Sequence, residues 1–147
     1  MWDRLSYNAS RALQIAQIEA SIRGENTVGL EHLLLGITKP QARFKFVSVR
    51  MLERIGVDIA QVRTALYELL PPLSSTELVG NMQASLELMQ VMSFACQEAD
   101  TASQNYVGTE NLLLGIMRLE GSFVAQLLRQ QGATYENLYS CYCGLLQ

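Results

Sequence analysis

The chain has 147 residues, of which 49% are hydrophobic, and its net charge is -3. A chain of this size can bury roughly two thirds of its unfolded surface in one core. The negative charge argues against a nucleic-acid-binding protein, which needs a basic face. The apolar runs are too short to span a bilayer, and the start of the chain lacks the pattern of a signal peptide. We therefore expect a cytoplasmic protein with neither nucleic-acid nor membrane partners.

The chain contains an internal repeat. Residues 33–37 and 112–116 both read Leu-Leu-Leu-Gly-Ile, at an offset of 79 positions, and Glu19-Ala20 falls on Glu98-Ala99 at the same offset. Farther along, Gly56 pairs with Gly132 at an offset of 76, so the first copy carries three extra residues between positions 38 and 49. Such self-similarity indicates a fold made of two related units.

Each copy is predicted to form four helices. In the first copy, they cover residues 6–22 with Ser6 as N-cap, 29–39, 46–55 ending at Gly56, and 58–70 with Asp58 as N-cap. In the second copy, the helices open at Ser85, near Gly108, at Ser122 and at Thr134. The predicted fold is therefore all-α, with eight helices in two pseudo-twofold-related four-helix repeats.

The helices that contain Leu-Leu-Leu-Gly-Ile are apolar nearly all round, so they must be buried. Their glycines, Gly36 and Gly115, predict a close approach by a neighbouring helix. Pro71-Pro72 ends the last helix of the first copy. We expect one domain over residues 1–147, with repeat one at 2–71, a linker at 72–82 and repeat two at 83–147.

The doubled motif resembles that of the Clp N-terminal domain, in its ClpC-type version. Copy one reads Asn-Thr-Val-Gly-Leu-Glu-His-Leu-Leu-Leu-Gly-Ile over residues 26–37, and copy two reads Asn-Tyr-Val-Gly-Thr-Glu-Asn-Leu-Leu-Leu-Gly-Ile over residues 105–116. In that family, the domain precedes the AAA+ modules of Clp/Hsp100 unfoldases. The resemblance covers nearly the whole chain.

The resemblance implies a docking platform for proteins, without catalysis and without a cofactor. The sequence has no Gly-x-x-x-x-Gly-Lys-Ser/Thr phosphate loop for ATP. We expect an accessory protein, adaptor or regulator of a Clp protease–chaperone system, whose partners are Clp unfoldase or peptidase subunits, substrates or adaptors. The alternatives are a free-standing binder of unfolded or phosphoarginine-tagged substrates, and the N-domain fragment of a larger unfoldase. A location in the plastid stroma would also fit a mature organellar chain.

The resemblance also points to candidate binding residues. In some ClpC-type domains the motif glutamate helps to bind phosphoarginine, and the matching positions are Glu31 and Glu110. Thr109 retains the threonine that precedes this glutamate, whereas copy one has Leu30 there. The other interpretation is structural, because a carboxylate near a helix start is stabilised by the helix dipole.

The extra residues of copy one form another candidate site. Phe44, Lys45 and Phe46 lie in a predicted loop that also contains Lys39 and Arg43. The two phenylalanines could pack against the following helix, or they could form an exposed aromatic and basic patch for a partner protein.

No catalytic or metal-binding constellation is evident. His32 has no nucleophile motif beside it, so we expect it to bond locally. Glu19 and Glu98 could be a catalytic carboxylate pair, although such residues are more often solvated or bonded to the following loop. Three cysteines, Cys96, Cys141 and Cys143, suit neither a disulfide framework nor a metal site.

Overall fold

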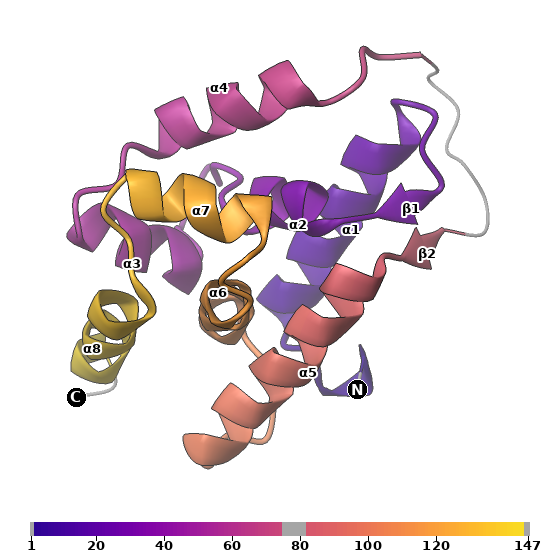
Figure 1. Cartoon of the computed structure of the whole chain (residues 1–147). Coiled ribbons are helices and arrows are strands. Elements are labelled where there is room, and N and C mark those ends of the chain that lie inside the picture. The colour runs from indigo at the N-terminus through magenta and orange to yellow at the C-terminus, as the bar shows by residue number, and fades with distance from the viewer. Residues whose placement is uncertain (1, 75–81, 146–147) are drawn as a thin grey trace.

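The computed structural model describes residues 2–74 and 82–145, and it confirms the all-α fold (Figure 1). In the first repeat, a 3-10 helix at Trp2–Arg4 precedes α1 (Tyr7–Ser21), β1 (Thr27–Val28), α2 (Leu30–Ile37), α3 (Val47–Arg54) and α4 (Ile59–Leu69). In the second, β2 (Gln83–Ala84) precedes α5 (Leu86–Thr101), α6 (Thr109–Arg118), α7 (Phe123–Gln130) and α8 (Tyr135–Leu145). Most of the predicted linker, 72–82, lies outside the described residues.

The predicted helix starts are confirmed by their capping bonds. The hydroxyls of Ser6 and Ser85 accept hydrogen bonds from the backbone N–H groups of Ala9 and Leu88, at 3.1 and 3.0 Å. The Asp58 carboxylate accepts one from Gln61 N–H at 3.1 Å. Each bond satisfies a donor that the first helical turn leaves unpaired.

Two short helices, α2 and α6, form the centre of the fold (Figure 1). Every residue of α2 except Glu31 is buried, and every residue of α6 except Glu110 and Arg118. Within each repeat, the long first helix packs on the central one, α1 on α2 and α5 on α6. Between the repeats, α3 packs on α6 and α8, while α7 packs on α2, so the buried side chains form one shared core.

The two repeats also exchange short backbone segments, which the sequence did not predict. The strand β1 of repeat one pairs in parallel with β2, which precedes α5, and Ser85 N–H donates to Val28 C=O at 2.9 Å. The equivalent bond on the other side joins Ser6 N–H to Val107 C=O at 2.8 Å. Each repeat therefore holds the segment that leads into the first helix of the other.

The start of α3 shows that the repeats have diverged in a coordinated way. Phe46 occupies the N-cap position of α3 and offers no capping oxygen. The hydroxyl of Thr109, from α6 of the other repeat, accepts a hydrogen bond from Ser48 N–H at 3.3 Å in its place. In α7 the equivalent N-cap is Ser122, which caps its own helix at Ala125, and the position equivalent to Thr109 is Leu30. Thus copy two has Thr109 where copy one has Leu30, and Thr109 caps α3, whereas α7 is capped by its own Ser122.

The predicted close approach at the motif glycines is confirmed. A Cβ atom at Gly36 would overlap the backbone carbonyl of Ala12 in α1, and one at Gly115 would lie 2.8 Å from the carbonyl oxygen of Val91 in α5. Because both obstacles are backbone atoms, they cannot move aside by changing rotamer. The glycines set the spacing between the central and the long helices.

No helix among the described residues is long and apolar enough to cross a bilayer.

Replacing Gly36 with alanine should lower the free energy of unfolding by about 1–3 kcal/mol, because overpacking must push α1 away from α2. Chemical denaturation followed by circular dichroism measures this change. The matched control is Gly144→Ala in α8, where the added Cβ meets open space. That change should be neutral or stabilise the protein by up to about 1 kcal/mol through helix propensity. Equal effects of the two substitutions would contradict the close-packing account.

Candidate functional site

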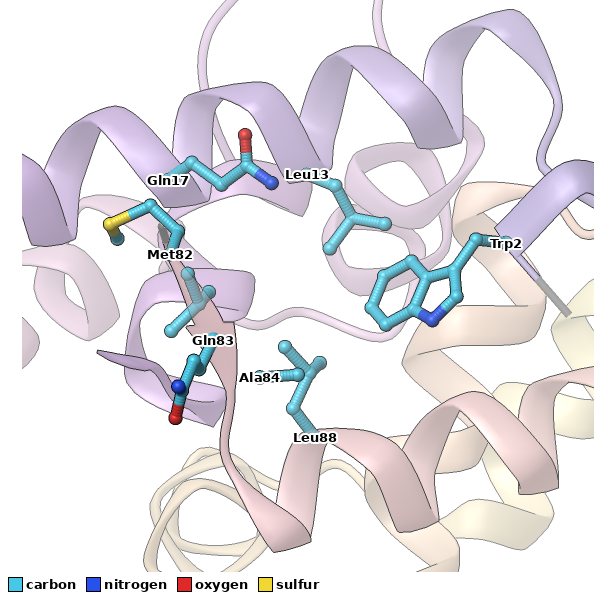
Figure 2. A pocket seen from close by; sticks show the side chains of 8 residues that line it. Trp2, Leu13, Gln17, Met82, Gln83, Ala84 and Leu88 are labelled. Carbon is cyan, nitrogen blue, oxygen red and sulfur yellow. The ribbon is translucent and has the colours of Figure 1, made fainter. Parts of the chain in front are cut away.

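A pocket lies on the seam between the repeats, and we call it the seam pocket (Figure 2). It has a volume of about 280 Å³. Trp2, Leu13 and Leu88 face one another at one end, while Gln17, Met82 and Gln83 border the other (Figure 2). The remaining lining residues are Val28 and Ala84, which come from the exchanged strands.

The lining gives the seam pocket an apolar floor and a polar rim. Leu13 and Leu88 are buried, whereas the indole of Trp2 is 46% exposed and Gln83 is also exposed. Trp2 therefore borders an opening, which the sequence could not predict because the opening depends on β2 lying beside α1. A pocket of this size accommodates one or two apolar side chains of a bound peptide, held by an exposed aromatic residue at its edge.

A second depression, which we call the Glu110 hollow, lies where the starts of three helices converge. Its volume is about 620 Å³. It is bordered by the first turns of α1, α3 and α6, and its lining residues are Leu5, Ser6, Tyr7, Asn8, Val47, Tyr106, Gly108, Thr109 and Glu110. Helix starts carry partial positive charge and free N–H groups, so this surface favours an anion. The carboxylate of Glu110 on the same wall favours a cation.

Glu110 bends back over the start of its own helix. A Cβ atom at Gly108 would overlap the Glu110 carboxylate, so the N-cap glycine leaves the space that this side chain occupies. Burial there raises the pKa of Glu110, although a backbone hydrogen bond opposes the shift. The carboxylate is thus held in a partly dry position from which it can bond a guanidinium group.

Glu31 occupies the equivalent position of copy one, in the first turn of α2. The cap itself is made by His32, whose Nδ1 accepts a hydrogen bond from Gly29 N–H at 2.9 Å. In copy two, Asn111 Oδ1 accepts the same bond from Gly108 N–H at 2.9 Å. His32 is fully buried and its Nε2 lies 2.9 Å from Glu25 Oε1, so it bonds locally as expected. His32 and Asn111 thus bond the N-cap glycines, while Glu31 and Glu110 lie in the first turn, where the helix dipole also stabilises a carboxylate.

The surface around Glu31 differs in chemistry from the Glu110 hollow. Around Glu31, Leu30 takes the position that Thr109 has in the Glu110 hollow. Glu87 of α5 takes the position that Asn8 of α1 has there. The additional carboxylate stands in the first turn of α5, where it neutralises the positive helix end. Copy one is consequently less suited to an anion than copy two.

The three candidate residues of the copy-one insertion, Phe44, Lys45 and Phe46, lie in different environments. Phe46 is fully buried, as the packing interpretation expects. Phe44 is 46% exposed, with its ring centroid 5.8 Å from that of Phe46. Lys45 is exposed and its Nζ lies 2.8 Å from Glu53 Oε1. Thus Phe46 anchors the loop, while Phe44 and Lys45 face solvent.

Glu19 and Glu98 belong to two separate bonded networks. Glu19 Oε2 lies 2.7 Å from Arg23 Nη1, in the turn after α1, and Glu19 Oε1 accepts a hydrogen bond from Tyr67 at 3.1 Å. Glu98 accepts hydrogen bonds from Tyr135 at 2.9 Å and lies 3.3 Å from Arg118. Partial burial and the Glu98 bond raise the pKa of Tyr135 to about 12. Both carboxylates are buried rather than solvated, and their bonds join helices.

Within residues 2–74 and 82–145, no group of three or more histidine, cysteine, aspartate or glutamate side chains could hold a metal ion.

Replacing Glu110 with glutamine should stabilise the protein more at about pH 8 than at about pH 4. A carboxyl whose pKa is raised on folding destabilises the folded state as pH rises through that pKa, because its ionised form is disfavoured there. Glutamine removes this pH-dependent cost. Thermal melts of wild type and E110Q at both pH values measure it. Glu120→Gln, at an exposed turn, is the control and should show the same difference in Tm at both pH values.

Comparison with known proteins identifies the family. The model of the Clp repeat (R) N-terminal domain matches residues 4–131. A probable ATP-dependent Clp protease ATP-binding subunit from Chlamydia pneumoniae is 30% identical over 128 residues, which are 87% of this chain and 15% of that protein. The chain thus spans only about 15% of the length of the curated relatives it matches.

Solved structures show the same fold. The N-terminal domain of the chaperone ClpD from Arabidopsis thaliana superposes with a TM-score of 0.73 and 22% identity, covering 100% of both chains. The N-domain of ClpV from Vibrio cholerae gives 0.75 and 21%, covering 98% of this chain and 86% of the other. With its doubled motif, its paired repeats and these matches, the chain belongs to the family of Clp repeat N-terminal domains.

Proposed function

We propose that this chain is a non-catalytic protein-binding module that serves a Clp protease–chaperone system as an adaptor or regulator. The observation that carries the proposal is the seam pocket, an apolar site built jointly by both repeats of a Clp N-terminal domain. Its relatives include ATP-binding subunits and chaperones of Clp systems. Such a pocket suits the binding of an apolar segment of a protein partner better than it suits catalysis. The residues that line it are apolar side chains and two glutamines.

The exposed indole of Trp2 offers a direct test of docking at the seam pocket. Wild-type protein immobilised on beads should recover Clp ATPase or peptidase subunits from a lysate of its source cells, identified by mass spectrometry. Trp2→Ala should weaken the binding of those subunits by about tenfold or more, because a buried tryptophan anchor contributes about 2 kcal/mol.

The matched control is Phe123→Ala, which removes another exposed aromatic side chain, 55% accessible, from α7. It should leave recovery unchanged. Recovery of no Clp subunit by wild type at several salt concentrations would refute the proposal. Equal loss with both variants would mean that binding occurs elsewhere than at the seam pocket.

A second candidate function is the recognition of a phosphoarginine-tagged substrate, favoured by the chemistry of the Glu110 hollow. Phosphoarginine carries a phosphate next to a guanidinium group. The converging helix starts suit the phosphate, and the Glu110 carboxylate suits the guanidinium. Tyr7 and Tyr106, which are 79% and 53% exposed, stand at its edge.

Calorimetric titration of phosphoarginine separates the two repeats. E110Q should weaken binding by about tenfold or more, because one charge-assisted hydrogen bond contributes about 1.5–3 kcal/mol. Glu31→Gln, the equivalent change in copy one, should have little effect. No heat with wild type would exclude this ligand, and equal losses with both variants would contradict the assignment to copy two.

A further inference from the structure

Positive charge in this chain is concentrated in one segment. Residues 39–54 hold five of the 11 Lys and Arg and one of the 14 Asp and Glu, which gives the segment a net charge of +4. The remaining six cations and 13 carboxylates give the rest of the chain -7. The net charge of -3 is therefore the sum of one basic segment and an acidic remainder.

The helix α3 and the loop before it bring three of these cations, Lys45, Arg50 and Arg54, to one surface. Lys45, Arg50, Glu53 and Arg54 surround a shallow depression of about 540 Å³. Arg50 and Arg54 are four residues apart and so share one face of α3, opposite the buried side chains Met51 and Leu52. With Arg43 and Phe44 just before Lys45, we call this surface the basic patch.

Most of the basic patch has no internal counterion. Lys45 pairs with Glu53, but Arg43, Arg50 and Arg54 have no ion-pair partner among residues 2–74 and 82–145. By contrast, Arg4, Arg23 and Arg118 each bond a carboxylate elsewhere in the fold. Arg43, Arg50 and Arg54 are exposed and can bond another molecule.

Phe44 adds an apolar contact at the edge of these charges. Its ring is 46% exposed and leans on the buried ring of Phe46 at 5.8 Å. A side chain held this way loses little freedom on binding, and aromatic and arginine side chains are the usual anchors of protein interfaces.

The second repeat lacks this surface. At the positions that correspond to Arg50 and Arg54, α7 carries Gln126 and Gln130. The three extra residues of the first copy extend the loop that carries Arg43, Phe44 and Lys45. Of the two copies, copy one alone therefore carries the basic patch. Because α7 is helical with Gln126 and Gln130, a helix at the positions of Arg50 and Arg54 does not require arginine.

We propose that the basic patch docks an acidic segment of a partner protein, a run of Asp and Glu with an apolar side chain that packs on Phe44. Guanidinium groups bind carboxylates in bidentate geometry, which suits Arg43, Arg50 and Arg54. A nucleic acid fits less well, because an extended phosphate backbone would run beyond this one basic segment onto a chain that otherwise carries -7, and Phe44 is a single stacking surface. The residues of this surface line neither the seam pocket nor the Glu110 hollow.

The test measures binding of a dye-labelled peptide of repeated Glu-Glu-Leu by fluorescence anisotropy. Wild type should bind it, more weakly as salt is raised. Replacing Arg50 and Arg54 with the glutamines of copy two should weaken binding roughly fivefold to tenfold, since it removes two exposed ion pairs that are each weak. Phe44→Ala should also weaken it. The control is Arg11→Gln with Arg129→Gln, which removes two exposed arginines from α1 and α7.

Three results would overturn the proposal. The first is that wild type does not bind the peptide, or that R50Q/R54Q binds it as tightly as wild type. The second is equal weakening by the control pair, which would indicate an effect of net charge alone. The third is that single-stranded DNA, phosphatidylserine vesicles or a second copy of the chain binds the same arginines more tightly than the peptide. If R50Q/R54Q does not fold, Arg43→Gln in the exposed loop tests the same surface.

Discussion

The burial of two helices that are apolar nearly all round is the constraint on which this fold depends. A helix such as α2 cannot lie at a surface without exposing leucine side chains to water, at about 25 cal/mol for each Å² of apolar area. It must be surrounded, and a single repeat has only three other helices with which to surround it. The second repeat supplies the remaining cover, so α7 packs on α2 and α3 packs on α6. The glycines Gly36 and Gly115 then fix how closely the long helices approach. In the first turn of each central helix, one residue, Glu31 or Glu110, is not fully buried, so its carboxylate can contact another molecule.

The two repeats have kept this architecture while their surfaces have become different. The Glu110 carboxylate stands among three converging helix starts, whereas the equivalent surface around Glu31 has Glu87 in place of Asn8. The basic patch lies on the insertion and α3 of copy one. The change from Leu30 to Thr109 first suggests a loss of ligand binding in copy one. The structure offers a different reason, because the Thr109 hydroxyl caps α3, whose own N-cap residue is the buried Phe46. Divergence at one position of a repeat is thus compensated in the other repeat, which makes the halves mutually dependent.

Much of this fold is predictable from local sequence signals. Ser6, Ser85 and Asp58 mark helix starts because their side chains satisfy backbone donors a few residues away, and Gly56 marks a helix end because its φ of 87° favours glycine. The exchanged strands are not predictable in this way. Each is two residues long, so neither shows an alternating pattern, and each pairs with a segment more than 50 residues distant. The seam pocket was missed for the same reason, since Trp2, Val28 and Met82 meet only after the exchange. The buried position of Glu98 depends on Arg118 and Tyr135 from two other helices, whereas the i,i+4 spacing of Glu19 and Arg23 was visible in the sequence.

The reciprocal bonds at Val28 and Val107 have a consequence for how the two halves can differ. Each half offers a donor segment and an acceptor segment of the same kind, which is the self-complementarity of a twofold-symmetric dimer interface. The geometry is that of two subunits that exchange their leading segments, here joined in one chain. Covalent linkage fixes the ratio of the halves at one to one, so each half can change as long as its counterpart accommodates the change. A symmetric dimer could not confine the basic patch to one half, because every substitution would appear twice.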